Sequence, residues 1–477
     1  MKQLFRTILI TFAYGGVLFS HPIQSVAAET NLMTNNSKEL KAPIPDGKID
    51  MHFSAFITAK QAQAEALAEK AKRPVPQIVK DYFAAAKSGD WTTATNVEMR
   101  ISNLFAYPRV GDFYSDLMRV RQPLIEISGA WDQYHDWDAK FLQLYGREII
   151  ASIPAKSIYL GGTDPGRFLI TAMSESQIKG VPFFTLTQNA LADGTYLNYL
   201  SNMYGGRIYI ATADDSQKCF YDYVEDVKIR LKHDQQHPDE PRQIQPGEEP
   251  KIVNDQISIS GNVAVMAINA RIVKVIFDHN PDREFYIEES FPLDWMYPYL
   301  TPHQFIMKLN REPLKEVSTE TVKADREFWT HQTDSWFGSW LQANTTVQEL
   351  TDFVERVYLK KDFTGFKGDK RFVDDEEARK AFSKLRSSIA GIYAWRMTNS
   401  KNPAERQSMK AEADFAFRQA FLICPYSPEA IYRYINLLSF DNRLSDAVKI
   451  VKTALNLDPG NQQLESLLEN LIRSTKK

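Results

Sequence analysis

The C-terminal part of the chain repeats with a period of 34 residues, and this period restricts its fold more than any other feature. Five pairs of similar residues share the offset, so chance agreement is a poor explanation. Small residues at fixed positions let helices pack closely, and a proline that follows every second helix ends it. The period therefore predicts stacked helical hairpins. The pairs are Ala413 and Ala447, Phe417 and Val451, Ala420 and Ala454, Phe421 and Leu455, and Pro425 and Pro459.

The pattern A-x3-[F/V]-x2-A-[F/L]-x3-P is typical of tetratricopeptide-like repeats and is clearest over residues 411–461. About three such repeats are normally needed to bury a continuous core, so we expect these repeats to pack against neighbouring helices of the chain. The preceding segment SSIAGIYAWRM is expected to supply another first helix. The repeats predict a protein or peptide partner without indicating which one.

The N-terminus has the three parts of a secretory signal peptide. Lys2 and Arg6 form a basic start, residues 7–19 are apolar, and small residues precede a predicted cleavage after Ala28. The apolar core is shorter than the roughly 20 residues that a membrane-spanning helix needs. An uncleaved anchor is the alternative. We therefore expect a periplasmic or secreted protein without a transmembrane segment after signal cleavage.

Composition narrows the classes of ligand. The net charge is −3, and loss of the two basic residues of the signal makes it −5, which gives no general attraction to nucleic acid. Cys219 and Cys424 are the two cysteines of the chain, and we assign them to different regions, so their pairing is left open. Two isolated cysteines make neither a disulfide scaffold nor a zinc site. No metal and no cofactor are expected.

Strand-like and helix-like segments alternate in the middle of the chain. This predicts an α/β region with a mostly parallel sheet, between a helical N-terminal region and a helical C-terminal region with the repeats. The expected regions are a signal peptide at 1–28, a flexible leader at 29–54, helices at 55–152, the α/β domain at 153–315 and helices at 316–477. The expected strands are 157–161, 183–187, 207–211, 283–290 and 303–310, and the expected helices are 167–178, 194–203, 214–232 and 263–278.

The segment SIYLGGTDPGRFLI holds the clearest ligand-binding candidate. A predicted strand ends in glycines and leads into a helix for which Asp164 and Pro165 supply start signals. Backbone N–H groups and Arg167 at such a helix start can hold an anion, and ligands gather at the carboxyl ends of strands in open α/β sheets. A loop that only turns the chain needs the same residues, and no nucleotide-binding motif is present. The hypothetical site consists of Gly161, Gly162, Thr163, Asp164, Gly166 and Arg167.

Three other clusters have ordinary structural explanations beside functional ones. The first, WDQYHDWDAKF, offers Asp132, His135, Asp136 and Asp138 as ligands for a metal, but such acidic residues more often lie at the solvent-exposed N-terminus of a helix. The second, Trp329, Trp336 and Trp340, can stack on sugars, but helical spacing favours the core. The third is a basic patch of Lys360, Lys361, Lys367, Lys370 and Arg371, which suits either a solvated loop or an acidic partner.

No local catalytic motif is present: the sequence lacks H-E-x-x-H, C-x-x-C and G-x-S-x-G. Catalytic residues brought together from distant positions stay possible, so enzymatic activity is left open, with absence favoured.

The order of segments IYLGGTDPGRF, PFFTLTQ, INARIVKVIFDHNPDREFYIEES and YPYLTPHQFIMKLNR resembles the soluble tail of bacterial multi-spanning O-mannosyltransferase-like proteins. Tetratricopeptide repeats often follow these tails. The resemblance covers about residues 150–310. The acids of the family's loop are reduced here to Asp164, and the membrane part that would bind a lipid-linked sugar is missing. The resemblance therefore implies an accessory module that binds a glycan, a peptide or a partner protein without transferring a sugar.

The sequence thus predicts an extracytoplasmic binding or scaffold protein of the cell envelope, accessory to glycan or surface-protein assembly. One alternative is an enzyme that acts on a sugar or phosphate at the loop from Gly161 to Arg167, and another is a purely structural role in assembly through the repeats.

Overall fold

The computed structural model describes residues 51–105, 112–174, 181–253, 256–290 and 292–475. The predicted signal peptide, and the leader as far as residue 50, lie outside the described residues. The chain divides into two compact units that interleave along the sequence. Among the described residues, the first unit holds those up to 135 and those within 167–283, and the second holds those within 136–166 and those from 284 onward.

The first unit is mainly helical. Its elements are α2 (Met51–Lys70), α3 (Gln77–Ser88), α4 (Trp91–Phe105), α5 (Asp112–Asp136), α7 (Ile170–Ser174), β2 (Phe184–Thr187), α9 (Gly194–Tyr204), α10 (Ala213–Gln236), β3 (Glu249–Val253), β4 (Gln256–Ser260) and α11 (Asn262–His279).

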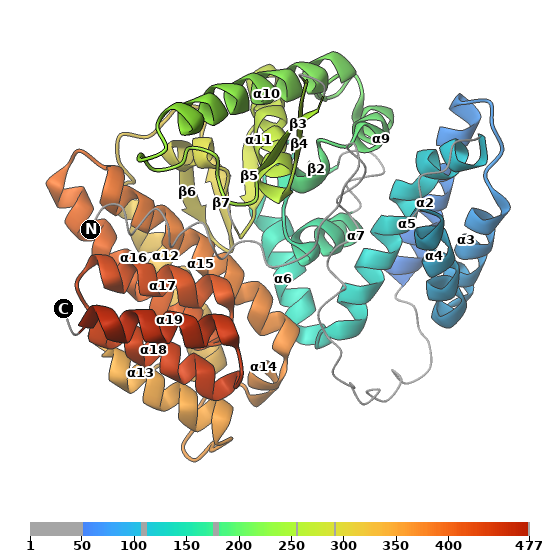
Figure 1. Ribbon diagram of the computed structural model, residues 1–477. Helices are drawn as coiled ribbons and strands as arrows, with labels where there is room; N and C mark the ends of the chain where they lie inside the picture. Colours follow the sequence, from blue (N-terminus) through green and yellow to red (C-terminus); the bar gives the residue numbers. More distant parts are fainter. Residues whose placement is uncertain (1–50, 106–111, 175–180, 254–255, 291, 476–477) are drawn as a thin grey trace. The chain divides into compact units, whose positions relative to one another are not determined.

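Local sequence accounts for several of these elements. Gly89 ends α3 in the left-handed conformation, with φ of 78°, and Ala94 of α4 is buried, so the segment GDWTTA forms the turn of a helical hairpin. Helix α11 is the buried helix predicted over 263–278. The β3–β4 hairpin packs on α10 and α11 (Figure 1) and was not predicted.

The strand predicted over 207–211 is wrong, because the structure has only an isolated bridge between Gly205 and Ile208 there. The side chain of Asn280 takes the place of a neighbouring strand. It accepts a hydrogen bond from Tyr209 N at 2.8 Å and donates one to Tyr209 O at 3.0 Å. An amide side chain therefore satisfies both backbone groups that a strand would pair.

The second unit combines a small sheet with most of the C-terminal helices. Its elements are α6 (Ala139–Ser152), β1 (Ile158–Gly161), β5 (Phe285–Glu288), η4 (Asp294–Tyr299), β6 (Leu300–His303), β7 (Ile306–Leu309), α12 (Thr319–Phe337), α13 (Val347–Val354), η5 (Glu355–Leu359), α14 (Lys370–Asp374), α15 (Glu376–Asn399), α16 (Pro403–Ile423), α17 (Pro428–Phe440), α18 (Leu444–Leu457) and α19 (Gln462–Thr475).

The sheet has mixed strand directions, which corrects the expectation of a mostly parallel sheet. Strands β1 and β5 are parallel, whereas β7 is antiparallel to both β5 and β6. Only Gln304 and Phe305 separate β6 from β7, and a parallel pair needs a much longer crossover. The parallel pairing of β1 with β5 also places the segment after residue 284 in the same unit as residues 136–166.

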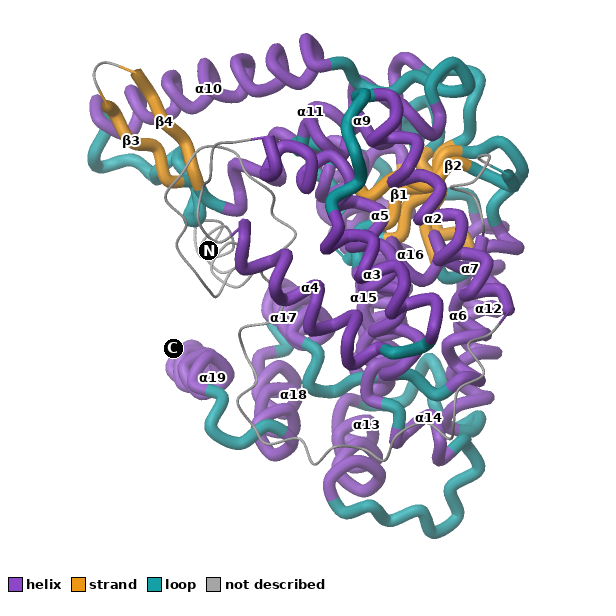
Figure 2. The backbone as a smooth tube through the Cα atoms, turned by 90° about the vertical axis from the view of Figure 1, so that its right-hand side faces the viewer, coloured by secondary structure: helices purple, strands orange, loops and turns teal. Residues whose placement is uncertain are grey.

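Five consecutive helices, α15 to α19, end the chain, and each packs on the next (Figure 1). Figure 2 shows α17, α18 and α19 almost end-on as neighbouring rods. The alanines of the sequence period are fully buried between these helices. In the residues that the structure describes, no helix has the length and apolar character to cross a membrane.

Candidate functional site

The loop that follows β1 encloses a carboxylate of the protein itself. Gly161 pairs with Glu288 in the β1–β5 register, and the fully buried Glu288 side chain lies beneath the loop. Gly162 N and Thr163 N donate to Glu288 Oε2 at 3.3 and 3.1 Å, and Thr163 Oγ1 donates to Oε1 at 2.7 Å. Tyr145 Oη, from α6, donates to the same Oε1 at 3.1 Å. The N–H groups considered for an external anion therefore point at Glu288.

The glycines of the loop follow from this packing. A Cβ at Gly162 would overlap the carboxylate of Glu289, and a Cβ at Gly166 would overlap that of Glu288. Gly166 N also donates to Thr163 Oγ1 at 3.2 Å, which closes the turn. Close approach of two acidic side chains is a sufficient reason for glycine at both positions.

Charged side chains from the C-terminal helices complete the surroundings of the loop. Lys384 Nζ of α15 lies 3.6 Å from Glu429 Oε1 of α17. Burial alone would lower the pKa of Lys384, but the charges of Glu429, Asp164 and Glu288 raise it by more than burial lowers it, so the net shift is upward. Burial raises the pKa of Glu288 despite its hydrogen bonds. The region is thus an acidic cluster with lysine as counter-ion, which is unfavourable for phosphate.

The boundary between the two units falls directly before Arg167. Arg167 lies in a π-helical turn, Pro165–Leu169, that precedes α7, and it belongs to the first unit, whereas Gly161 to Gly166 belong to the second. Its guanidinium carbon lies 4.0 Å from the centre of the Phe168 ring. The last residues of the helix expected over 167–178 lie outside the described residues.

Several of the remaining sequence candidates have structural roles. Asp138 caps α6 and binds Arg371 of the basic patch, and among the described residues no cluster of three His, Cys, Asp or Glu side chains could hold a metal ion. Trp329 and Trp336 are buried, which confirms the core interpretation for these two. Cys219 and Cys424 are both buried free thiols.

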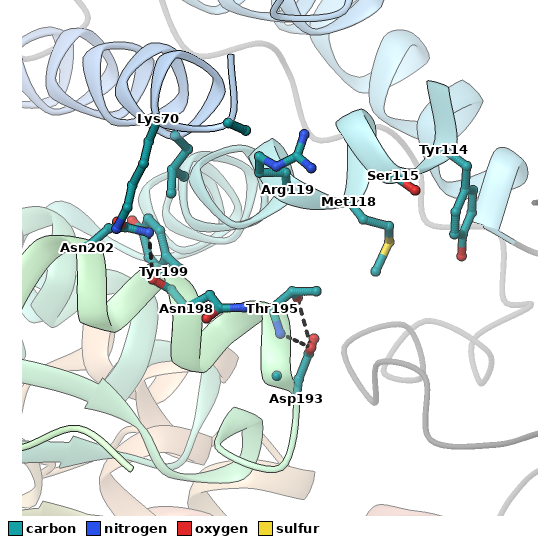
Figure 3. A pocket seen from close by; sticks show the side chains of 13 residues that line it. Lys70, Tyr114, Ser115, Met118, Arg119, Asp193, Thr195, Asn198, Tyr199 and Asn202 are labelled. Carbon is teal, nitrogen blue, oxygen red and sulfur yellow. Dashed lines mark hydrogen bonds between the residues drawn. The ribbon is translucent and has the colours of Figure 1, made fainter. Parts of the chain in front are cut away.

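A second candidate, which sequence reasoning missed, is a cavity of about 700 Å³ in the first unit. It lies among α2, α5 and α9, and Figure 3 shows the side chains that these helices place along it. The lining mixes aromatic, amide, hydroxyl and charged groups. It consists of Leu67, Lys70, Ala71, Tyr114, Ser115, Met118, Arg119, Asp193, Gly194, Thr195, Asn198, Tyr199 and Asn202.

A buried polar cluster lies behind Tyr199 in the wall of this cavity. Lys60 of α2, only 1% exposed, forms an ion pair with the buried Glu126 of α5. Lys60 Nζ donates to Tyr199 Oη at 2.8 Å. The same hydroxyl lies 2.8 Å from both Glu126 Oε2 and Gln63 Oε1, so it donates to one of these two acceptors. The cluster therefore fixes the buried Tyr199 side chain within the wall of the cavity.

Burial has opposite effects on the two titratable partners. It lowers the pKa of Lys60 to about 8, although the neighbouring Glu126 acts in the other direction. It raises the pKa of Tyr199 well above its ordinary value, and Glu126 adds to that shift. Tyr199 accordingly remains a protonated donor at neutral pH.

One sequence signal could have revealed this cluster. Lys60 occupies a position of helical spacing within an apolar stripe of α2, where a charged residue requires a partner. The other buried members of the stripe are Phe53, Phe56, Ile57, Ala64, Leu67 and Ala68.

A second hollow, of about 490 Å³, lies in the second unit beside the start of α13. Arg418 of α16 fills part of its wall and donates to the carbonyls of Ala343 and Thr345. Arg443 of α18 forms an ion pair of 2.7 Å with Asp414. The charges of this hollow are therefore largely paired within the protein.

Comparison of the chain with protein-family models, with curated proteins and with solved structures finds no match.

Proposed function

We propose that this protein is an extracytoplasmic binding protein of the cell envelope that holds a sugar-like ligand in the cavity of its first unit. The lining of that cavity is the observation that carries the proposal. A sugar ring presents a C–H face and hydroxyl groups that both donate and accept hydrogen bonds. Tyr114 offers aromatic surface, Asn198 offers an amide that both donates and accepts, and the Thr195 hydroxyl, which donates to Asp193, can still accept.

The size of the cavity supports this ligand class. A volume of about 700 Å³ falls in the range of small-molecule sites. The hydrogen bonds of the buried Tyr199 to the Lys60 cluster hold this part of α9 in place before any ligand arrives, which reduces the entropy lost on binding.

Calorimetric titration of the full chain with a panel of neutral and acidic monosaccharides and disaccharides tests the proposal. We expect at least one sugar to bind, and Asn198→Ala and Tyr114→Ala to weaken its binding by about tenfold, or about 1.4 kcal/mol. Asn470→Ala, on the exposed surface of α19, is the matched control and should leave affinity unchanged. Absence of binding by every sugar would refute the function, as would equal losses in the control.

The location in the envelope rests on the N-terminal sequence pattern. The mass of the protein recovered from the extracytoplasmic fraction should correspond to a chain that begins at Glu29. Recovery of an unprocessed chain in the cytoplasm would refute this part of the proposal.

We further propose that the C-terminal helices are tetratricopeptide-like hairpins that dock a protein or peptide partner. The ends of α16 and α18, at Ile423 and Leu457, keep the offset of 34 residues found in the sequence, and so do the starts of α17 and α19. This agreement supports the repeat assignment. Crosslinking of the full chain in its envelope, with loss of the crosslink after deletion of α17 to α19, would test for a partner.

An enzyme acting at the loop after β1 is the second candidate. One observation favours it: a buried carboxyl with a raised pKa, Glu288, lies at the carboxyl ends of two parallel strands. Asp164→Ala and Arg167→Ala should then abolish turnover of a sugar or phosphate ester without unfolding the protein. Unchanged turnover in both variants would remove this candidate.

A further inference from the structure

The charges that line the cavity of the first unit indicate which kind of sugar it binds, and this inference rests on the proposed function. Lys70 and Arg119 contribute cations to the lining, and among the described residues of the lining Asp193 is the only carboxylate. Figure 3 shows Lys70 and Arg119 on the α2 and α5 sides, with Asp193 at the start of α9.

The two cations are only partly compensated. Lys70 Nζ donates to a neutral acceptor, Asn202 Oδ1, at 2.5 Å, and it forms no ion pair with any described residue. Arg119 pairs with Asp116 at 2.8 Å, but that carboxylate also pairs with Arg73 at 2.9 Å. Two guanidinium groups therefore share Asp116, although Arg73 also reaches the exposed Asp112.

The carboxylate of the lining, in contrast, is already engaged. Asp193 caps α9, and its Oδ1 accepts hydrogen bonds from both Thr195 N and Thr195 Oγ1 at 2.8 Å. The partial positive charge of the helix start and the buried Arg121, whose charge interacts with Asp193, offset its negative charge. Behind the wall, Lys60 and Glu126 balance each other. The cavity is therefore left with an excess of positive charge.

We infer that this cavity selects a sugar that carries a carboxylate, a hexuronate, over the neutral sugar with the same ring. The carboxylate lies between Lys70 and Arg119, where it gains charge-assisted hydrogen bonds, and the ring hydroxyls face Asn198 and Thr195. In a chain with a net charge of −3, the positive cavity also distinguishes this site from the acidic surroundings of the Glu288 loop.

Calorimetry of the full chain with matched pairs tests the inference: glucose with glucuronate, galactose with galacturonate, and mannose with mannuronate. We expect one hexuronate to bind at least about tenfold more tightly than its neutral partner, and most of the difference to disappear at about 0.5 M salt. Lys70→Gln and Arg119→Gln should each lower the affinity for the hexuronate more than the affinity for the neutral sugar, and should thereby remove most of the preference. Lys80→Gln, an exposed lysine of α3, is the control and should keep the preference.

The outcomes separate this inference from the function on which it rests. Equal affinity within every pair would overturn the inference and leave sugar binding intact. Tighter binding of glucosamine than of glucuronate would also overturn it, because it would make Asp193 the dominant charge. Failure of all sugars to bind would refute the proposed function, and the inference with it.

Discussion

The buried Lys60 gives the sharpest test of the structure, because its charge produces a dependence of stability on pH with a predictable sign. In the folded protein burial lowers the pKa of Lys60 from 10.5 to about 8. Between these two values the unfolded chain binds more protons than the folded one. The free energy of unfolding therefore rises with pH in this window, and the penalty for burying the charge is present in full below about pH 8.

The size of the effect follows from the same two pKa values. One unit of pKa difference corresponds to about 1.4 kcal/mol, and the Lys60 contribution to the free energy of unfolding should rise by about 2 kcal/mol between about pH 7 and about pH 9.5. Tyrosines of the unfolded chain begin to titrate near the upper end of this range, so the effect is measured against a variant that lacks the ion pair. Replacing both partners, as Lys60→Met with Glu126→Gln, removes the ion pair without leaving a buried charge unpaired.

Urea denaturation followed by circular dichroism, at intervals across this range, measures the effect. We expect the stability of the parent to rise by about 2 kcal/mol relative to the double variant as pH increases. Lys60→Met alone should be less stable than the double variant by about 3–5 kcal/mol near pH 7, because it leaves the buried Glu126 carboxylate without its ion-pair partner. Parallel pH profiles for the parent and the double variant would show that Lys60 is not buried as a charged group.

Three further predictions concern other parts of the fold. Gly166→Ala should lower the free energy of unfolding by about 1–3 kcal/mol, because the added Cβ overlaps the Glu288 carboxylate. Gly194→Ala, whose added Cβ has no atom within 4 Å, should change it by less than about 0.5 kcal/mol. Equal effects of the two variants in urea denaturation would contradict this packing. Ala420→Leu should destabilise by about 1–3 kcal/mol at the α15–α16 contact, and the exposed Ala411→Leu on the same helix should not; the difference in melting temperature decides. Burial raises the pKa of Cys219, and that of Cys424 to about 11, so a thiol reagent at about pH 8 should label both cysteines only in denaturant; rapid labelling of the native chain would contradict their burial.

Elements defined by local chemistry were predictable from the sequence. The αL glycine at position 89, the β5 segment within 283–290 and the buried helix α11 all depend on residues close to one another in the chain. Helical spacing and strand propensity are short-range signals, so they locate such elements without knowledge of their partners.

Features that depend on distant partners were not predictable in the same way. The segment at Tyr209 reads as a strand, but Asn280, 71 residues away, satisfies its backbone instead. The direction of β7 depends on the short turn to β6, and the two interleaved units depend on the pairing of β1 with β5. The cavity escaped prediction because its walls come from α2, α5 and α9, and only the lysine in the apolar stripe of α2 gave a local sign of it.

The loop after β1 shows most directly why a glycine-rich turn does not by itself identify a ligand. Its sequence specifies N–H donors and the space for an acceptor, but not the acceptor. Here the acceptor is the side chain of Glu288, 125 residues from Thr163, and its position is fixed because Gly161 and Glu288 are partners in the β1–β5 register. A neutral or small residue at the end of β5 would leave the same N–H groups open to an external anion. The last residue of the paired strand therefore decides between a turn with an internal carboxylate and an anion-binding loop, and in this chain it favours the turn.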